Sequence, residues 1–96
     1  MELSRSDLVQ SVAGRDKGML FYVIDTDGVY VSLANGKERR AEKPKRKKEK
    51  HVRKLARPDS SLTAKIRSGE HILNSELRRE LAALSQTINV STKEGS

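Results

Sequence analysis

One stretch of the sequence, Lys37–Arg57, carries most of the side chains that could do chemistry, and that chemistry is the binding of anions. It holds twelve Lys and Arg residues against three Glu, a local net charge of +9, whereas the whole chain of 96 residues has a net charge of +7. A concentrated basic segment favours a polyanionic partner, because each phosphate that it neutralises releases condensed counterions. Nucleic acid is the preferred interpretation. A solvated charged segment and a patch for anionic membranes are the alternatives.

A second charged cluster precedes this stretch, at Gly14–Gly18, with the sequence Gly-Arg-Asp-Lys-Gly. Two glycines around three charged residues predict an exposed turn, since glycine adopts positive φ at little cost. The turn is either a plain connector or a surface on which Arg15, Lys17 and the backbone approach a phosphate closely.

The candidate RNA-binding residues are the cations of these two segments and one histidine. They are Arg15, Lys17, Lys37, Arg39, Arg40, Lys43, Lys45, Arg46, Lys47, Lys48, Lys50, His51, Arg53 and Lys54. Lys and Arg bind phosphate without reading sequence, so affinity should come from charge and specificity from RNA shape. For each cation the alternative is a solvated side chain. His51 is either a base or phosphate contact or an ordinary strand histidine, and a flat sheet would let only one of Arg53 and Lys54 join the patch.

Other kinds of site find little support in the sequence. The chain has no cysteine, and its two histidines have no partner at metal-ligand spacing. No serine stands in a G-x-S-x-G turn and no P-loop is present. We therefore predict no enzyme, no cofactor, no metal and no small-molecule substrate. Tyr22 and Tyr30 are either stacking platforms or, as we prefer, core residues.

The longest apolar run, Met19–Ile24, is too short to cross a bilayer, and the first residues lack the apolar region of a secretory signal. We expect a cytoplasmic, monomeric protein with no membrane partner.

Alternating and apolar segments joined by Gly-containing turns predict a mainly β domain. Asp25–Gly28 and Asn35–Gly36 indicate hairpins, and Pro44 should end a strand and open an exposed loop over Lys45–Lys50. The spacing of Val52 and Leu55 in the last strand also implies a slip or bulge, whose position the sequence leaves open. The predicted strands cover residues 7–13, 19–25, 29–34, 37–41 and 51–56, and together they indicate a small barrel.

The C-terminal part is predicted to be helical. Asn74 is a favourable N-cap, and Leu77, Leu81 and Leu84 place one apolar stripe on a helix over Ser75–Ser85. The stripe either packs on the barrel or binds a partner protein. The expected organisation is a barrel over 4–58, a helical appendage over 59–85 and a disordered tail over 86–96.

The segment Val9–Asp25 resembles a KOW motif, in which a strand, a turn with glycine and a basic residue before a second glycine, and an apolar strand follow one another. The wider layout is similar to ribosomal large-subunit protein fourteen of archaea and eukaryotes, and to small stand-alone KOW proteins of bacteria. Lys65–Gly69 and Asn74–Leu77 are similar to the ending of that family. General KOW motifs carry a further glycine where this chain has Leu20 or Phe21, which makes transcription-elongation KOW domains a poorer match.

The resemblance implies an SH3-like barrel and ribosomal RNA as ligand, with the large subunit favoured. The function expected from it is docking on ribosomal or other structured RNA, in ribosome function, assembly or quality control. A protein-interaction adaptor that uses the C-terminal helix and a transcription-associated KOW factor are the alternatives.

Overall fold

The computed structural model describes the backbone of residues 2–94 and the side chains of residues 2–87. Five strands form one antiparallel sheet in the order β4-β3-β2-β1-β5. The strands are β1 (Leu8–Ser11), β2 (Leu20–Thr26), β3 (Tyr30–Ala34), β4 (Lys45–Lys48) and β5 (Val52–Ala56). A short 3-10 helix, η1 (Glu49–His51), and the helices α1 (Ser61–Ser68) and α2 (Asn74–Glu94) complete the domain. The mainly β organisation with a C-terminal helix agrees with the prediction.

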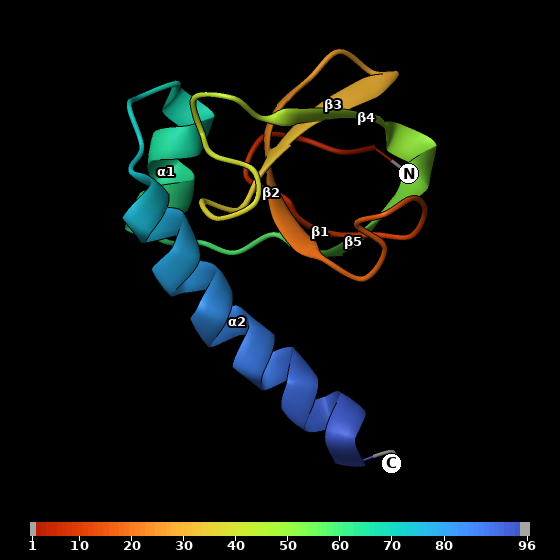
Figure 1. Ribbon diagram of the computed structural model, residues 1–96. Coiled ribbons are helices and arrows are strands. Elements are labelled where there is room, and N and C mark those ends of the chain that lie inside the picture. The colour runs from red at the N-terminus through yellow and green to blue at the C-terminus, as the bar shows by residue number, and fades with distance from the viewer. Residues whose placement is uncertain (1, 95–96) are drawn as a thin grey trace.

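The sheet curves strongly but is not closed, because β4 and β5 form its two edges and are not paired with each other (Figure 1). The three residues of η1 carry the chain from one edge to the other. Between β1 and β5 the register shifts at Leu8/Val9, which is the irregularity that the strand spacing predicts.

The sheet is buried on both faces, and strand alternation decides which residues go where. Leu8, Tyr22 and Ala34 face the helices and form one apolar cluster with Leu62 and Leu77. The opposite, concave face buries a second cluster, whose members are Leu3, Val9, Phe21, Val23, Val31, Leu33 and Val52. Three successive residues of β2 are thus inaccessible to solvent. Both faces of β2 are therefore buried at these positions.

Two predictions for the basic stretch are wrong. Residues 37–41 form an irregular loop and no strand, because the Asn35 side chain accepts hydrogen bonds from the backbone N–H groups of Lys37 and Arg39, both at 3.0 Å. The expected exposed loop after Pro44 is instead β4, which pairs with β3 from Leu33↔Lys45 to Tyr30↔Lys48.

The helices begin and end at sequence signals. Ser60 and Thr63 form a reciprocal capping box at the start of α1, and Gly69 ends that helix with φ 77°. At α2 the Asn74 side chain does not cap its own helix: its Oδ1 accepts from the Ala41 N–H at 2.7 Å and its Nδ2 donates to Glu42 at 2.6 Å. It therefore ties the loop after β3 to α2.

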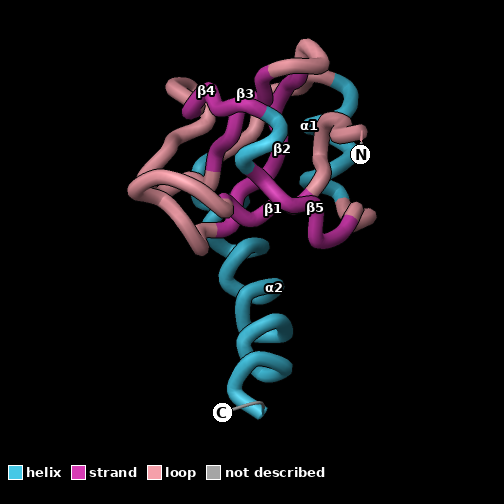
Figure 2. The backbone as a smooth tube through the Cα atoms, turned by 90° about the vertical axis from the view of Figure 1, so that its right-hand side faces the viewer, coloured by secondary structure: helices cyan, strands magenta, loops and turns pink. Residues whose placement is uncertain are grey.

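The first half of α2 lies against the sheet and its second half extends away from it (Figures 1 and 2). The helix runs to Glu94, past the predicted end at Ser85, and residues 95 and 96 of the expected tail lie outside the described residues. Neither helix in the described part of the chain has the length and apolar content needed to span a bilayer.

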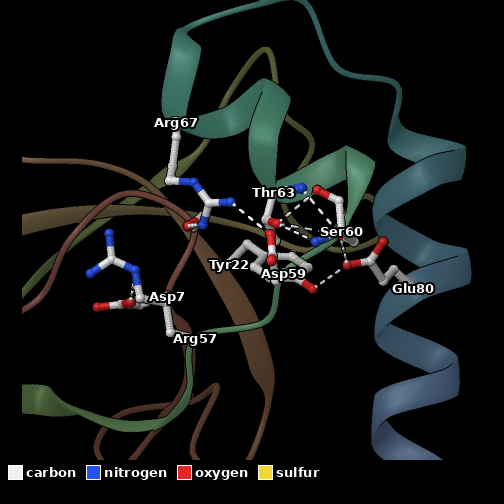
Figure 3. A network of polar contacts seen from close by, with 9 residues as sticks. Asp7, Tyr22, Arg57, Asp59, Ser60, Thr63, Arg67 and Glu80 are labelled. Atoms are coloured by element: carbon white, nitrogen blue, oxygen red, sulfur yellow. Dashed lines mark hydrogen bonds and ion pairs between the residues drawn. The ribbon is translucent and has the colours of Figure 1, made fainter.

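A polar network fastens both helices to the sheet (Figure 3). The buried Tyr22 hydroxyl donates to Glu80 of α2 at 2.6 Å, and the same carboxylate oxygen accepts from Ser60 Oγ at 2.8 Å. Burial, reinforced by this carboxylate, raises the pKa of Tyr22 far above its ordinary value. The protonated phenol donates to α2, and Glu80 connects this contact to the N-cap of α1.

Candidate nucleic-acid interface

The turn between β1 and β2 is closed by its own backbone. Gly14 and Gly18 have φ of 84° and 93°. The Gly18 N–H donates to the Ser11 carbonyl at 2.8 Å, and the Met19 N–H donates to the Asp16 carbonyl at 2.9 Å. Arg15 and Lys17 are exposed on this turn, as the sequence predicts.

Asp16, between these two cations, points inward and is only 8% exposed. Its Oδ1 lies 2.7 Å from Lys47 Nζ and accepts from Ser11 Oγ at 2.7 Å, while Oδ2 lies 3.2 Å from Lys45 Nζ. Burial alone would raise the pKa of Asp16, but hydrogen bonds from Lys47, Ser11 and Lys45 outweigh it and hold that pKa well below its ordinary value. The carboxylate is therefore ionised and binds two lysines of an edge strand.

Strand alternation explains why only some lysines reach this carboxylate. Lys45 and Lys47 pair with Leu33 and Val31 and share their concave face of the sheet. Lys47 Nζ also donates to the Ala13 carbonyl at 2.7 Å, and Lys47 is only 8% exposed. Among the candidate residues Lys47 is thus an internal ion-pair partner.

Two further contacts bring basic residues to the turn. The Val12 N–H, just before it, donates to the carbonyl of the half-buried His51 in η1 at 2.9 Å. A hollow of about 550 Å³ has both Gly18 and Lys37 among its lining residues. We call the cations of the turn, together with those of the segments that contact it or share this hollow with it, the basic rim. Its members are Arg15, Lys17, Lys37, Lys45 and Lys50.

The outer face of β4 carries a different pair of cations. The Arg46 guanidinium lies 4.3 Å from the centre of the Tyr30 ring and 3.1 Å from Asp27. Lys48 is exposed and lines, together with Lys50 and Val29, an open hollow of about 560 Å³. Arg46 is therefore engaged with the hairpin, whereas Lys48 extends the cationic surface beyond the rim.

The loop cations lie at the helix side of the domain. Arg39, Arg40 and Lys43 are exposed on the segment that Asn74 holds against the start of α2. Arg40 is paired with Glu42 at 3.1 Å. The basic stretch therefore spans the molecule from the helices to η1 and does not form one compact cluster (Figure 1).

The two strand cations of β5 differ, as adjacent strand residues should. Arg53 is exposed and donates to Gln10 of β1 at 2.9 Å. Lys54 lies 3.6 Å from the fully buried carboxylate of Asp7, which Arg57 also approaches at 4.0 Å (Figure 3). Lys54 is thus held inward, and Arg53 alone adds to the surface.

Sequence reasoning missed both buried carboxylates. The only signal was that Asp16 stands between two cations in a glycine-bounded turn, where a third cation or a neutral residue would serve a phosphate site better. Asp7 gave no signal, because its partners, Lys54 and Arg57, are distant in sequence, in and after the last strand of the sheet.

The described residues offer little for other chemistry. No three or more His, Asp or Glu side chains in that part of the chain gather as metal ligands. None of the three aromatic rings presents an open face on which a base could stack. Phe21 and Tyr22 are fully buried, and Tyr30 is half-buried with Arg46 over its ring.

No protein-family model matches this chain, and a comparison with curated proteins finds no significant match. The resemblance to KOW proteins therefore stays a prediction from the residues that carry it.

Proposed function

We propose that this protein is a non-enzymatic RNA-binding protein of the KOW type, with an SH3-like barrel, which docks on ribosomal or other structured RNA. The observation that carries the proposal is the basic rim. Arg15 and Lys17 are exposed, have no acidic partner among the described residues, and stand on a turn whose backbone is fixed by its own hydrogen bonds. Lys48 and Lys50 are exposed as well, on β4 and η1, and no acidic partner is found for either among the described residues.

Folded RNA suits this surface better than a flexible single strand. Single-strand binding draws much of its affinity from bases stacked on exposed aromatic rings, and each ring of this chain is buried or covered by a guanidinium. The remaining source of affinity is the contact of Lys and Arg with phosphates, which is strongest where a folded RNA holds phosphates close together.

The resemblance selects the ribosome as the site of action, in ribosome function, assembly or quality control, with the large subunit favoured. A closed barrel of that family would bring the edge strands β4 and β5 together. In this chain the three residues of η1 are the connection between these two strands. The leucine stripe favours the RNA proposal over the adaptor alternative, because Leu77 and Leu81 are buried in the domain's own core and Leu84 packs against it.

The first test is the salt dependence of RNA binding, with one arginine removed at a time. The binding constant of the full chain for an RNA hairpin with a fully paired stem is measured by filter binding over a range of salt concentrations. We expect a steep negative log–log slope. Arg15→Gln should weaken binding and make the slope shallower by about 1, because one phosphate contact is lost.

Arg79→Gln is the matched control, since Arg79 is exposed on α2 and the charge change is identical. It should leave slope and affinity close to those of the unchanged chain. A slope near zero for the unchanged chain would exclude counterion release and with it the proposal.

A second measurement separates the ribosome from the transcription alternative. The tagged protein is followed through a sucrose gradient, with and without a high-salt wash. We expect it to sediment with ribosomal particles and to be released by salt. Co-purification with RNA polymerase and absence from ribosomal fractions would favour a transcription-associated factor.

A further inference from the structure

Asp16 contradicts a simple electrostatic picture of the basic rim. It is the one acidic residue of the turn Gly14–Gly18, and it stands between the two cations of that turn, both of which are exposed. By charge alone, an aspartate here repels phosphate, and its removal would improve binding.

The contacts of Asp16 give it a different role. Its two carboxylate oxygens bind Lys47 and Lys45 of β4 at 2.7 and 3.2 Å, and Lys47 Nζ reaches the Ala13 carbonyl at 2.7 Å as well. A turn that projects from one side of the sheet is thereby fastened to an edge strand 31 residues away in sequence. No other ion pair in the described part of the chain joins the turn to the sheet.

The attachment of Asp16 to β4 also affects the two residues that flank it, Arg15 and Lys17. Asp16 is buried in the turn, whereas Arg15 and Lys17 on either side of it are exposed. Without the carboxylate, Lys47 would be left as a buried, uncompensated ammonium, which is strongly destabilising until the side chain moves out to solvent. Its escape would detach the turn from β4, and Arg15 and Lys17, although still on a turn closed by its own backbone, would no longer be held at a fixed place relative to the sheet.

We infer that Asp16 is a positioning residue that strengthens RNA binding by holding Arg15 and Lys17 toward the ligand. The inference rests on the proposed function, and it predicts a sign opposite to that of simple Coulomb attraction. Removing the negative charge at Asp16 makes the chain more positive and frees two lysines, and yet RNA binding becomes weaker.

The test compares two substitutions at Asp16 with one at Asp27, using the same RNA hairpin and salt series. Asp16→Asn should weaken binding about tenfold and make the slope shallower by about 2, as two positioned phosphate contacts are lost. Asp16→Glu keeps the charge but adds a methylene, so it displaces the turn without changing the electrostatics. It should also weaken binding, by about threefold, which is half of the tenfold effect on a logarithmic scale.

Asp27→Asn is the matched control. Asp27 is also paired with one basic residue of β4, Arg46 at 3.1 Å, but it lies on an exposed hairpin. Asn retains the Oδ1 acceptor that the N–H groups of Val29 and Tyr30 use. This variant loses the same negative charge and frees a cation, but it leaves the turn Gly14–Gly18 in place. Its affinity for the RNA hairpin should therefore be equal to or higher than that of the unchanged chain.

All variants are measured below their melting temperatures, which circular dichroism establishes. The salt slope counts phosphate contacts and does not respond to a uniform loss of stability. Tighter or unchanged binding by Asp16→Asn, with a steeper slope, would overturn the inference and leave the proposed function standing. Should Asp16→Asn not fold, Asp16→Glu decides alone, and binding equal to that of the unchanged chain refutes the positioning role. A flat slope for the unchanged chain refutes the proposed function itself.

Discussion

At the scale of single residues, two glycines with the same backbone conformation have very different surroundings. Gly28 and Gly36 have φ of 92° and 79°, in the region that L side chains rarely adopt. A Cβ added at Gly28 would have no atom within 4 Å, whereas one added at Gly36 would collide with the Asn74 carbonyl oxygen and touch Leu77. Gly36 is therefore needed both for the turn and for the approach of α2.

Gly36→Ala should destabilise the domain by about 3 kcal/mol, because strain from positive φ adds to a clash with backbone that cannot rotate away. Gly28→Ala, the matched control, should cost only about 1 kcal/mol from backbone strain. Urea unfolding followed by circular dichroism measures both. Equal losses for the two variants would contradict the close approach of α2 at Gly36.

At the scale of elements, α2 is placed on the sheet by one buried phenol as well as by its leucines. Tyr22 is inaccessible to solvent on β2, and its hydroxyl meets the Glu80 carboxylate at 2.6 Å. A hydrogen bond to a charged group stabilises the folded state more than one between neutral groups. When such a bond is lost, a buried polar group left without a partner carries a desolvation cost. The Tyr22–Glu80 bond thus links the central strand to the C-terminal helix.

Tyr22→Phe should therefore lower the free energy of unfolding by about 2 kcal/mol, with Glu80 still bonded to Ser60. Tyr30→Phe is the control for the same chemical change. The Tyr30 hydroxyl has no hydrogen bond within the described residues, so its removal should change stability by less than about 0.5 kcal/mol. The comparison is made by urea unfolding at neutral pH, and similar effects of the two changes would argue against the helix-docking role of Tyr22.

At the scale of the whole molecule, carboxylates scattered through a strongly basic chain make folding sensitive to acid. Although burial opposes it, hydrogen bonds from Lys47, Ser11 and Lys45 hold the pKa of Asp16 well below its ordinary 3.8. A hydrogen bond from Asn74 first, with help from Arg40, lowers the pKa of Glu42 to about 2. Such groups bind fewer protons when folded than when unfolded, so they stabilise the folded state above their unfolded pKa.

The free energy of unfolding should accordingly stay level from neutral pH down to about pH 5 and fall steadily below about pH 4, as the carboxylates are protonated. Asp16→Asn lacks the group with the strongly lowered pKa, and its stability should fall less over the acid range. Urea titrations at a series of pH values give both curves. Parallel curves for the two proteins would show that Asp16 does not have a lowered pKa in the folded state.

Local chemistry predicted much of this molecule. The apolar segment Met19–Asp25, the turn at Gly14–Gly18 and the hairpin at Asp25–Gly28 are encoded by neighbouring residues, and each is found where the pattern predicts it. The leucine stripe of α2 likewise predicts which helix face is buried. Such features depend on side-chain periodicity and turn chemistry, which a short window of sequence contains.

Only the tertiary structure decided which charges remain free. Nothing in Lys45–Lys48 distinguishes a strand from a loop, because four cations show no apolar alternation. Lys47 is buried only because the carboxylate of Asp16 is brought from 31 residues away. Desolvating an ammonium is costly unless a partner meets it, and a partner that is distant in sequence becomes visible only when the sheet has brought the two segments together.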